Sequence, residues 1–422
     1  MPEQMPEQMT AAGLDPIAWP IELTDLPDTA YLVGGAVRDA LLGRRRSVLD
    51  LDVVLESGAI DLARTIAGRY GAGFVVLDHD RQIARVVFPA GTLDVAVQVG
   101  GSIERDLERR DFTINAIAYQ PHRGEWVDPL NGRGDLAARS LRMVAVENLI
   151  DDPLRLLRAY RLSAQLDFQV EPATAAAIAQ QVPTLKRVAA ERVRAELDYL
   201  LETPRGDRAL LAAATIDLWR DWLPVLTERS RSTLVALNAA VAQLQALWPS
   251  VPIADPLPNG RSPLAAARLA CLLGSDLTLA QATLDRLKTS RVDHRILLAI
   301  LAALASLPPT VAEAPLDRAG QYALCKAAGD GFPAAALLAI AQGTRPAVLA
   351  EAISRWQDPT DRVAHPYSPL TGDALMAEFA VPRGPIVGRL LAALERAQAV
   401  GQVDSLESAR FFAQRWLQNS GF

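Results

Sequence analysis

YLVGGAVRDALLGRRRSVLDLD, residues 31–52, is the stretch from which the fold of the chain can be worked out. Its apolar start predicts a short buried strand over 31–33, and the pattern after Gly34 and Gly35 predicts a helix over 36–42. Glycines between a strand and a helix let the backbone come close to a ligand, and the first helical turn offers unpaired N–H groups to an anion. These residues therefore predict a phosphate cradle, although a Gly-Gly pair is more often only a turn.

Two carboxylates close the stretch. Asp50 and Asp52 lie two residues apart on a second predicted strand, so both side chains point to the same face. Paired aspartates at the end of a strand are often only solvated or capping a helix. A phosphate cradle beside two parallel carboxylates is a more specific combination, because a magnesium-dependent phosphoryl or nucleotidyl transfer needs both parts.

The chain around this stretch predicts an α+β fold. Strand-like and helical segments alternate up to about residue 145, and the remainder is almost wholly helical. The first part predicts a small mixed sheet of four or five strands with helices packed on it. Besides the stretch above, the pattern predicts a helix over 61–70 and strands over 74–77, 83–88 and 92–97.

Two further groups of polar residues follow along the chain. Asp94 lies on the strand 92–97 and is a candidate third carboxylate; a turn residue at the end of a strand is the equal alternative. RRDFTINA, residues 109–116, places Arg110, Asp111 and Asn115 in front of an apolar run that is predicted to be helical. An N-cap of that helix is the alternative role for Asp111.

The segment DDPLRLLRAYRLSAQLDF, residues 151–168, has apolar residues at helical spacing and a proline at a position tolerated in a first turn. Asp152, Arg155 and Arg158 follow at intervals of three, which puts them on one face of the predicted helix. An acceptor and a fork-shaped donor on a rigid helix can read the edge of one nucleobase. An intrahelical ion pair worth roughly a few tenths of a kcal/mol is the alternative.

In this order, GGxxRD with DxD, RRDxxxNA, the loop VDPLNGRGDL at 127–136 and DDPLR resemble the signatures of the class II tRNA nucleotidyltransferases. This family contains the CCA-adding enzymes and the bacterial poly(A) polymerases. A fifth motif, Glu191-Arg192 with Glu196, resembles the family's ERxxxE, which implies a brace for the base-selecting helix; a solvated helix face is the alternative. Asp151 stands where the family usually has Glu.

The resemblance implies a domain order. A polymerase-beta-like head over 28–145 precedes a helical neck over 146–200 that selects the nucleobase. A helical body over 201–360 is implied to bind tRNA at its acceptor end and T-arm. A helical tail over 361–422 follows the body, and residues 1–27 are expected to form a poorly ordered N-terminal tail.

The resemblance also implies the chemistry. It is a two-metal transfer with Mg²⁺, from CTP and with ATP as a second candidate substrate. Asp50 and Asp52 are the implied metal ligands, and Asp94 joins them as a catalytic carboxylate. The residues implied to bind the nucleoside triphosphate and its base are Gly34, Gly35, Arg38, Asp39, Arg110, Asp111, Asn115, Asp152, Arg155 and Arg158.

One departure from the family pattern bears on the product. Members that build a complete CCA end usually have a longer stretch, rich in charged and aromatic residues, between the third carboxylate and RRD. Here only residues 95–109 separate Asp94 from Arg110. In the family that loop is associated with switching from C to A, and its absence with enzymes that stop after two cytidines. The sequence therefore favours a CC-adding enzyme working with a separate A-adding enzyme; complete CCA addition, A addition and poly(A) synthesis are the alternatives.

Composition sets the remaining expectations. The net charge of −6 argues against a nucleic-acid partner, but arginines cluster at 44–46, 105–110, 155–161 and 186–194, and their forks suit phosphates. A GC-rich genome would produce the same arginine bias. The two cysteines have no metal-binding spacing, and the longest uncharged apolar run, 296–307, is far below the roughly 20 residues of a membrane span. We therefore expect a cytoplasmic protein without a membrane partner or structural zinc.

Three other activities are disfavoured. LACLLGSD, residues 269–276, has no histidine where many longer relatives carry a His-Asp phosphohydrolase, so that activity is predicted to be absent. A DxD glycosyltransferase predicts neither RRDFTINA nor DDPLR. A non-catalytic RNA-binding module does not require the retained Asp50 and Asp52.

Overall fold

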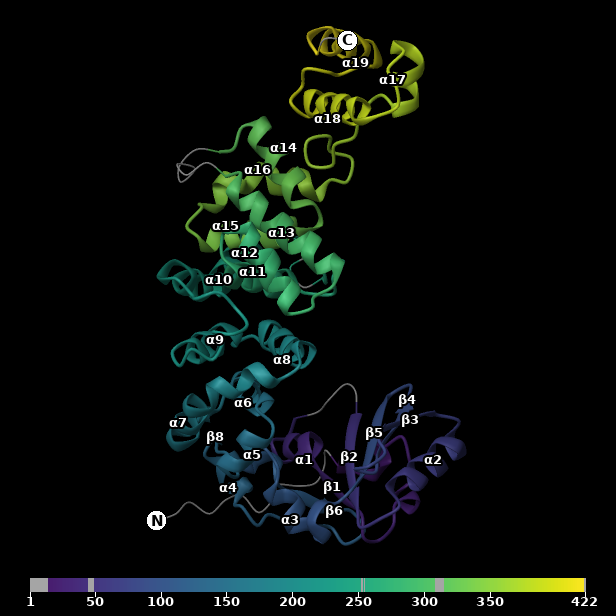
Figure 1. Ribbon diagram of the computed structural model, residues 1–422, viewed down its shortest axis with the longest axis vertical. Coiled ribbons are helices and arrows are strands. Elements are labelled where there is room, and N and C mark those ends of the chain that lie inside the picture. The colour runs from purple at the N-terminus through teal and green to yellow at the C-terminus, as the bar shows by residue number, and fades with distance from the viewer. Residues whose placement is uncertain (1–13, 45–48, 252, 254, 308–314, 421–422) are drawn as a thin grey trace. The chain divides into compact units, whose positions relative to one another are not determined.

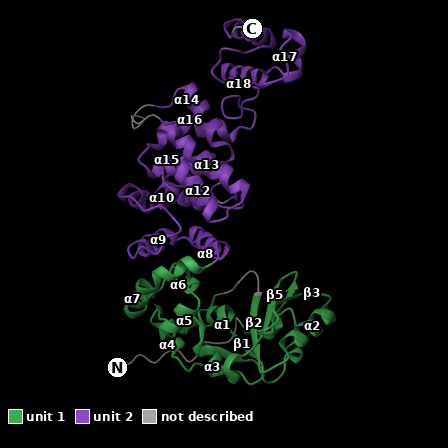
Figure 2. Ribbon diagram, viewed as in Figure 1, with its two compact units in different colours: residues 1–188 green, residues 189–422 purple. Residues whose placement is uncertain are grey.

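The computed structural model divides into two compact units, residues 1–188 and 189–422 (Figure 1, Figure 2). The boundary falls inside the segment predicted as the neck. The predicted fold class is confirmed: the first unit carries a mixed sheet with helices, and the second is helical. The structure describes residues 14–44, 49–251, 253, 255–307 and 315–420.

The sheet of the first unit has seven strands in the order β3-β4-β5-β2-β1-β6-β7. The pair β2–β5 is parallel, and the other pairs are antiparallel. The strands are β1 (Tyr31–Val33), β2 (Leu49–Leu55), β3 (Gly73–Asp78), β4 (Ile83–Phe88), β5 (Gly91–Val97), β6 (Ala118–Gln120) and β7 (Glu125–Val127). Five of them agree with the predicted strands, whereas β6 and β7 extend the sheet beyond the prediction.

Alternation along the central strands separates an apolar face from an acidic one. Leu51, Val53 and Leu93 are buried, while the even-numbered Asp52 and Asp94 point to the other side of the sheet and stay partly accessible. The helix α2 (Ala59–Tyr70) packs against β4 and β5. The core of the unit therefore leaves one face of the central strands for charged side chains.

The remaining elements of the first unit are mostly short. The helices are α1 (Gly34–Leu41), α3 (Ile103–Glu108), α4 (Gly132–Ala137), α5 (Val146–Asp151), α6 (Leu154–Leu166) and α7 (Pro172–Gln181), and β8 (Ser140–Leu141) pairs with β9 (Gln169–Val170). The helix predicted after RRD is wrong: a single 3-10 turn, Thr113–Asn115, leads into β6. Ile114, Ala116 and Ala118 are all fully buried, and a short apolar run buried on every side has no periodicity that separates helix from strand.

The segment 151–168 is also broken, which corrects the single helix predicted there. The helix α5 ends at Asp151, Asp152 has extended backbone angles, and Pro153 caps the start of α6. The ring of a proline disfavours helical geometry in the residue before it, which accounts for the break. Asp152 therefore precedes the helix that carries Arg155 and Arg158.

Residues 14–27, predicted as part of a poorly ordered tail, are folded onto the first unit. Two 3-10 turns form there, and Trp19 and Leu26 are buried. Asp25 binds Arg69 and accepts a hydrogen bond from Tyr70, both at the end of α2. Residues 1–13 and the arginines at 45 and 46 lie outside the described part of the chain.

The second unit is a stack of helices around α15, which contacts α10, α11 and α13 and is buried from Phe332 to Ile340 (Figure 1). Residues 318–341 are long and apolar enough to span a membrane, but 72% of their most apolar window is buried within the unit. The helices are α8 (Ala190–Glu202), α9 (Gly206–Ala214), α10 (Glu228–Leu247), α11 (Pro263–Leu273), α12 (Leu277–Arg286), α13 (Arg291–Ala305), α14 (Arg318–Ala328), α15 (Phe332–Ala341), α16 (Pro346–Gln357), α17 (Gly372–Phe379), α18 (Pro385–Ala399) and α19 (Leu406–Asn419).

The last three helices build a hydrophobic core of their own, which includes Leu375, Leu390 and Leu417. Polar groups on α14 meet this tail. Arg318 donates a hydrogen bond to the carbonyl of Ala399, and Lys326 and Tyr322 both contact Glu395. The tail is therefore packed within itself and joined to α14 by hydrogen bonds and an ion pair.

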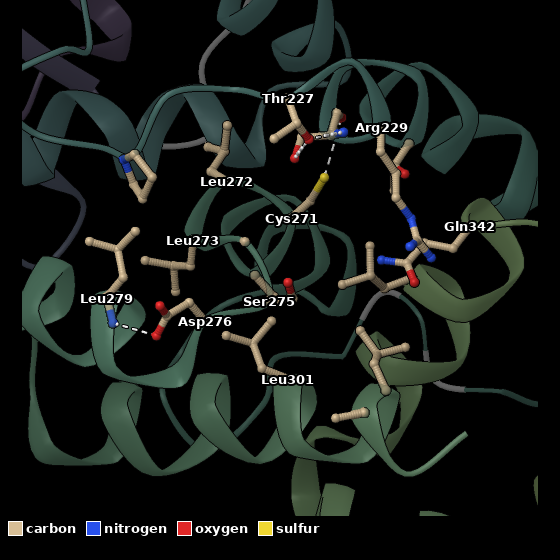
Figure 3. A pocket seen from close by; sticks show the side chains of 18 of the residues that line it. Thr227, Arg229, Cys271, Leu272, Leu273, Ser275, Asp276, Leu279, Leu301 and Gln342 are labelled. Atoms are coloured by element: carbon tan, nitrogen blue, oxygen red, sulfur yellow. Dashed lines mark hydrogen bonds between the residues drawn. The ribbon is translucent and has the colours of Figure 1, made fainter. Parts of the chain in front are cut away.

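A cavity of about 420 Å³ opens between α10, α11 and α13 of the second unit (Figure 3). Its lining is largely apolar, and the thiol of Cys271 donates to the carbonyl of Ser230. Burial raises the pKa of Cys271 to about 12, so this thiol stays protonated and is no nucleophile at neutral pH. Asp276, in the region compared with the phosphohydrolase, caps the start of α12.

Candidate active site

The glycine turn and one of the paired aspartates are in direct contact. Gly34 has φ +75°, a left-handed conformation that favours glycine, and Val33 is paired with Asp52 across β1 and β2. A Cβ atom on Gly34 would lie 2.7 Å from Oδ2 of Asp52 and 3.6 Å from Nη1 of Arg110. The turn therefore has room for a carboxylate and a guanidinium only because residue 34 has no side chain.

The three predicted carboxylates share one face of two parallel strands. The register of β2 and β5 sets Asp52 beside Asp94 and Asp50 beside Thr92. The hydroxyl of Thr92 donates to Oδ1 of Asp50 over 2.8 Å. Parallel pairing in this register thus gathers carboxylates that are more than forty residues apart in the sequence.

An arginine that the sequence did not single out completes this face. Arg85, on β4, lies opposite Asp94 in the sheet and donates from Nε and Nη2 to its two oxygens over 2.7 and 2.8 Å. The hydrogen bonds that Arg85 donates to Asp94, together with the charges of Asp94, Asp50 and Asp52, raise the pKa of Arg85 against the opposing effect of its burial. In the sequence, the only indication of this role was that Arg85 lies on the predicted strand 83–88.

The oxygens of Asp50 and Asp52 suit a magnesium ion. Mg²⁺ is usually bound in proteins by one or two carboxylates together with substrate phosphates and water, and these two side chains lie on one face next to the glycine turn. Within the described ranges, no three or more His, Cys, Asp or Glu side chains are grouped to hold a metal. Two carboxylates, with phosphate and water as the remaining ligands, match the way Mg²⁺ is usually bound in proteins.

The residues of RRDxxxNA form a buried chain of hydrogen bonds that runs from α1 to α6. Arg38 donates to Asp39 over 2.8 Å and from Nη1 to Asn115 over 2.8 Å. The amide of Asn115 donates to Asp111 over 3.0 Å, and Arg158 donates to the second oxygen of Asp111 from Nε and Nη2 over 2.9 and 2.8 Å. This chain links the helix after the glycine turn to the helix predicted to read the base.

Asp111 is charged inside this network. Burial acts to raise the pKa of its carboxyl, but Arg158, Asn115 and the backbone N–H of Phe112 outweigh burial and hold the pKa below its ordinary value. Asp111 does not cap a regular helix, since only a 3-10 turn follows it. Arg158, predicted to help read the base, is fixed by this carboxylate.

A second link connects RRD to the base-selecting segment. Asn148, on α5, is buried and donates to the carbonyls of Glu108 and Arg110, both over 2.8 Å. Its own carbonyl accepts from Nη1 of Arg155 over 3.1 Å. Burial lowers the pKa of Arg155. Asn148, which the sequence analysis missed, thus anchors the backbone of one signature and a side chain of another.

Arg110 is oriented by an acid one helical turn before it. Asp106, on α3, accepts from Nη2 of Arg110 over 3.0 Å, while its other oxygen accepts from the backbone N–H of Val99 over 3.1 Å. This leaves Nη1 of Arg110 toward Gly34. The positive charge predicted to meet a triphosphate therefore lies next to the glycine turn.

The loop 127–136 is closely packed. Asp128 accepts from the backbone N–H groups of Gly132 and Arg133, and a Cβ on Gly132 would lie 2.2 Å from the carbonyl of Thr113. Asp135 binds both the hydroxyl of Thr113 and Arg142. The third signature therefore supports the turn that carries Asn115.

The fifth motif lies in the second unit, on α8. Glu191 forms an exposed ion pair with Lys288 over 2.8 Å, which lowers the pKa of Glu191. Glu196 is buried. The predicted brace formed by Glu191, Arg192 and Glu196 stays a prediction.

Comparison with protein families gives two matches. The family described as the poly A polymerase head domain matches residues 30–98 and 94–142, and the one described as the probable RNA and SrmB-binding site of polymerase A matches 167–229. The first family matches in two segments that overlap at 94–98, and together they cover the seven-stranded sheet with Asp50, Asp52 and Asp94.

Individual relatives of three kinds resemble the whole chain. A CC-adding tRNA nucleotidyltransferase from Synechocystis sp. is 41% identical over 94% of this chain and 95% of its own length. An A-adding tRNA nucleotidyltransferase from Deinococcus radiodurans is 33% identical over 94% and 98%. The fold is also that of a CCA-adding enzyme solved in complex with CTP, at 23% identity, with a TM-score of 0.68 over 93% of this chain and 90% of that one.

Proposed function

The chain belongs to the class II tRNA nucleotidyltransferases, and on that premise we propose that it adds two CMP residues from CTP to the 3′ end of tRNA and then stops. It is an enzyme of nucleotidyl transfer, and its relatives act on tRNA. The number of nucleotides that the enzyme adds depends on features of this chain. A separate A-adding enzyme would then complete the CCA end.

The observation that carries the proposal is the segment between Asp94 and Arg110. Residues 95–109 are taken up by the end of β5, a 3-10 turn and α3, and Ile103 and Leu107 of α3 are buried in the core of the head. Asp106 ties the turn at Val99 to Arg110. No length of chain is left over there for the loop that the family associates with switching from C to A.

In the proposed reaction the 3′ hydroxyl of tRNA attacks the α-phosphorus of CTP, loses its proton and displaces pyrophosphate. Mg²⁺ held by Asp50 and Asp52 would lower the pKa of the hydroxyl and neutralise charge on the leaving group. The N–H groups at the start of α1 and the nearby Nη1 of Arg110 would bind the triphosphate. Asp152 and Arg155 would read the base, with Arg155 oriented by the carbonyl of Asn148.

The product decides between CC addition and its alternatives. The purified protein is given tRNA that lacks its CCA end, with CTP alone, ATP alone or both, and the product ends are sequenced. We expect two cytidines with CTP and no adenosine when ATP is added. Complete CCA ends would refute the proposed stop, and ATP-only tailing of unrelated RNA would identify a poly(A) polymerase.

An A-adding enzyme is the second candidate, because the Deinococcus relative matches this chain over nearly its full length. A tRNA that already ends in CC discriminates the two. An A-adding enzyme extends it with ATP, whereas the proposed enzyme leaves it unchanged.

The metal role has its own test. Asp52→Ala is expected to reduce CMP incorporation roughly 100- to 1,000-fold, as loss of a main electrostatic group does, while tRNA affinity measured by fluorescence anisotropy stays unchanged. Incorporation at the wild-type rate in magnesium would remove Asp52 from the mechanism. Glu56→Ala, an exposed acid just after β2, is the matched control.

A further inference from the structure

Asp94, on the acidic face, is held by an arginine of the neighbouring strand. Both oxygens of Asp94 accept hydrogen bonds from Arg85, over 2.7 and 2.8 Å, in a bidentate pair between neighbouring strands. Asp50 accepts one hydrogen bond from Thr92. A planar fork on a carboxylate is among the stronger polar contacts that side chains make, so Arg85 fixes the orientation of Asp94.

Arg85 also offsets the charge of this face. Three carboxylates on adjacent strand positions repel one another, and an opposite charge paired directly across the strands relieves that repulsion. Arg85 and Asp94 are exact register partners in β4 and β5, and their side chains are 42% and 22% exposed. The pair is therefore built by the sheet and does not depend on a flexible loop.

We propose that Arg85 is a positioning residue that keeps Asp94 out of the metal coordination sphere, so that Asp50 and Asp52 alone hold the divalent ion. This inference rests on the proposed function. A site with two carboxylates leaves more coordination positions for nucleotide phosphates and for the attacking hydroxyl than a site with three. The third carboxylate of the face then acts through Arg85, as a counter-charge, and is no metal ligand.

The test measures metal binding directly, by the electron paramagnetic resonance signal of free Mn²⁺ titrated with the full-length protein and a non-hydrolysable CTP analogue. Arg85→Gln is expected to tighten Mn²⁺ binding about tenfold, because it releases a third carboxylate to the ion. Asp94→Asn alone is expected to change the affinity less than about twofold, and Arg85→Gln with Asp94→Asn is expected to lose the gain.

Two controls separate this role from general electrostatics. Arg81→Gln removes one positive charge at the turn before β4, where the side chain is 80% exposed, and is expected to leave Mn²⁺ affinity unchanged. Arg85→Lys keeps the charge but loses the fork, so it is expected to give an intermediate gain. Thermal unfolding without metal reports whether each variant is folded. If Arg85→Gln does not fold, Arg85→Lys takes its place in the test.

The outcomes are distinct. A tenfold or larger loss of Mn²⁺ affinity in Asp94→Asn alone would show that Asp94 is a ligand and would overturn the inference. An unchanged Mn²⁺ affinity in folded Arg85→Gln and Arg85→Lys would also overturn it. The same holds if the gain in Mn²⁺ affinity persists when Arg85→Gln is combined with Asp94→Asn. Asp52→Asn tests the premise separately: wild-type Mn²⁺ affinity in that variant would refute the metal site itself, whereas its loss beside an unaltered Arg85→Gln would refute only the role of Arg85.

Discussion

Replacing Gly34 by alanine should separate the cost of backbone strain from the cost of disturbing Asp52. The new Cβ would lie 2.7 Å from Oδ2 of Asp52, closer than a carbon and an oxygen approach without repulsion, so the carboxylate must move by several tenths of an ångström. The left-handed backbone at φ +75° adds about 1–2 kcal/mol of strain for any residue with a Cβ. A misplacement approaching 1 Å costs on the order of 100-fold in rate.

We therefore expect Gly34→Ala to lose about 1–2 kcal/mol of unfolding free energy and roughly 10- to 100-fold in the single-turnover rate of CMP incorporation. Gly58→Ala is the matched control. Gly58 has φ +73° with no atom within 4 Å of the Cβ position, so it imposes the same strain without the collision. The unfolding free energy of Gly58→Ala, measured by urea denaturation, should fall by the same amount. Its single-turnover rate of CMP incorporation should stay at the wild-type value. Equal rates in the two variants would refute the argument that the glycine makes room for Asp52.

Two further changes test the buried charges. Asp111→Asn should lower the unfolding free energy by about 3 kcal/mol at pH 7, because it breaks a buried ion pair with Arg158. The pKa of Asp111 is held below its ordinary value, so its contribution is full above about pH 4 and is lost as pH falls toward the folded pKa; a stability deficit that persists unchanged at pH 2.5 would contradict this. Arg268→Lys should destabilise the second unit by at least about 3 kcal/mol, since the fully buried guanidinium donates to the carbonyls of Leu201, Thr203 and Pro204 at the end of α8. Arg295→Lys, an exposed ion pair, should change denaturant unfolding little, and equal effects would contradict the argument.

Local spacing was enough to predict the parts of the site that depend on one or two neighbouring elements. Two aspartates two residues apart on a strand must share a face, and a glycine pair between a strand and a helix marks a close approach. The structure places Asp52 against Gly34 accordingly. The strand over 83–88 was predicted with the bounds of β4 because turn residues flank it on both sides.

The partners of these residues depend on register, which spacing does not give. Arg85 meets Asp94 only because β4 and β5 form a hairpin in one particular alignment, and a shift by one residue would turn Arg85 to the other face. Asn148 reaches the carbonyls of Glu108 and Arg110 through a tertiary contact with no local signal. The break at Asp152, by contrast, was accessible from the sequence, because the following proline disfavours a helical residue there.

The three C-terminal helices have a consequence for how this family diversifies. Their apolar side chains pack against one another, and the contact with α14 includes polar contacts to Ala399 and Glu395. Removing the three helices would therefore expose little apolar surface on the rest of the protein. We expect this module to be gained or lost between lineages. We also expect a protein that is truncated before the module to stay folded and monodisperse in solution.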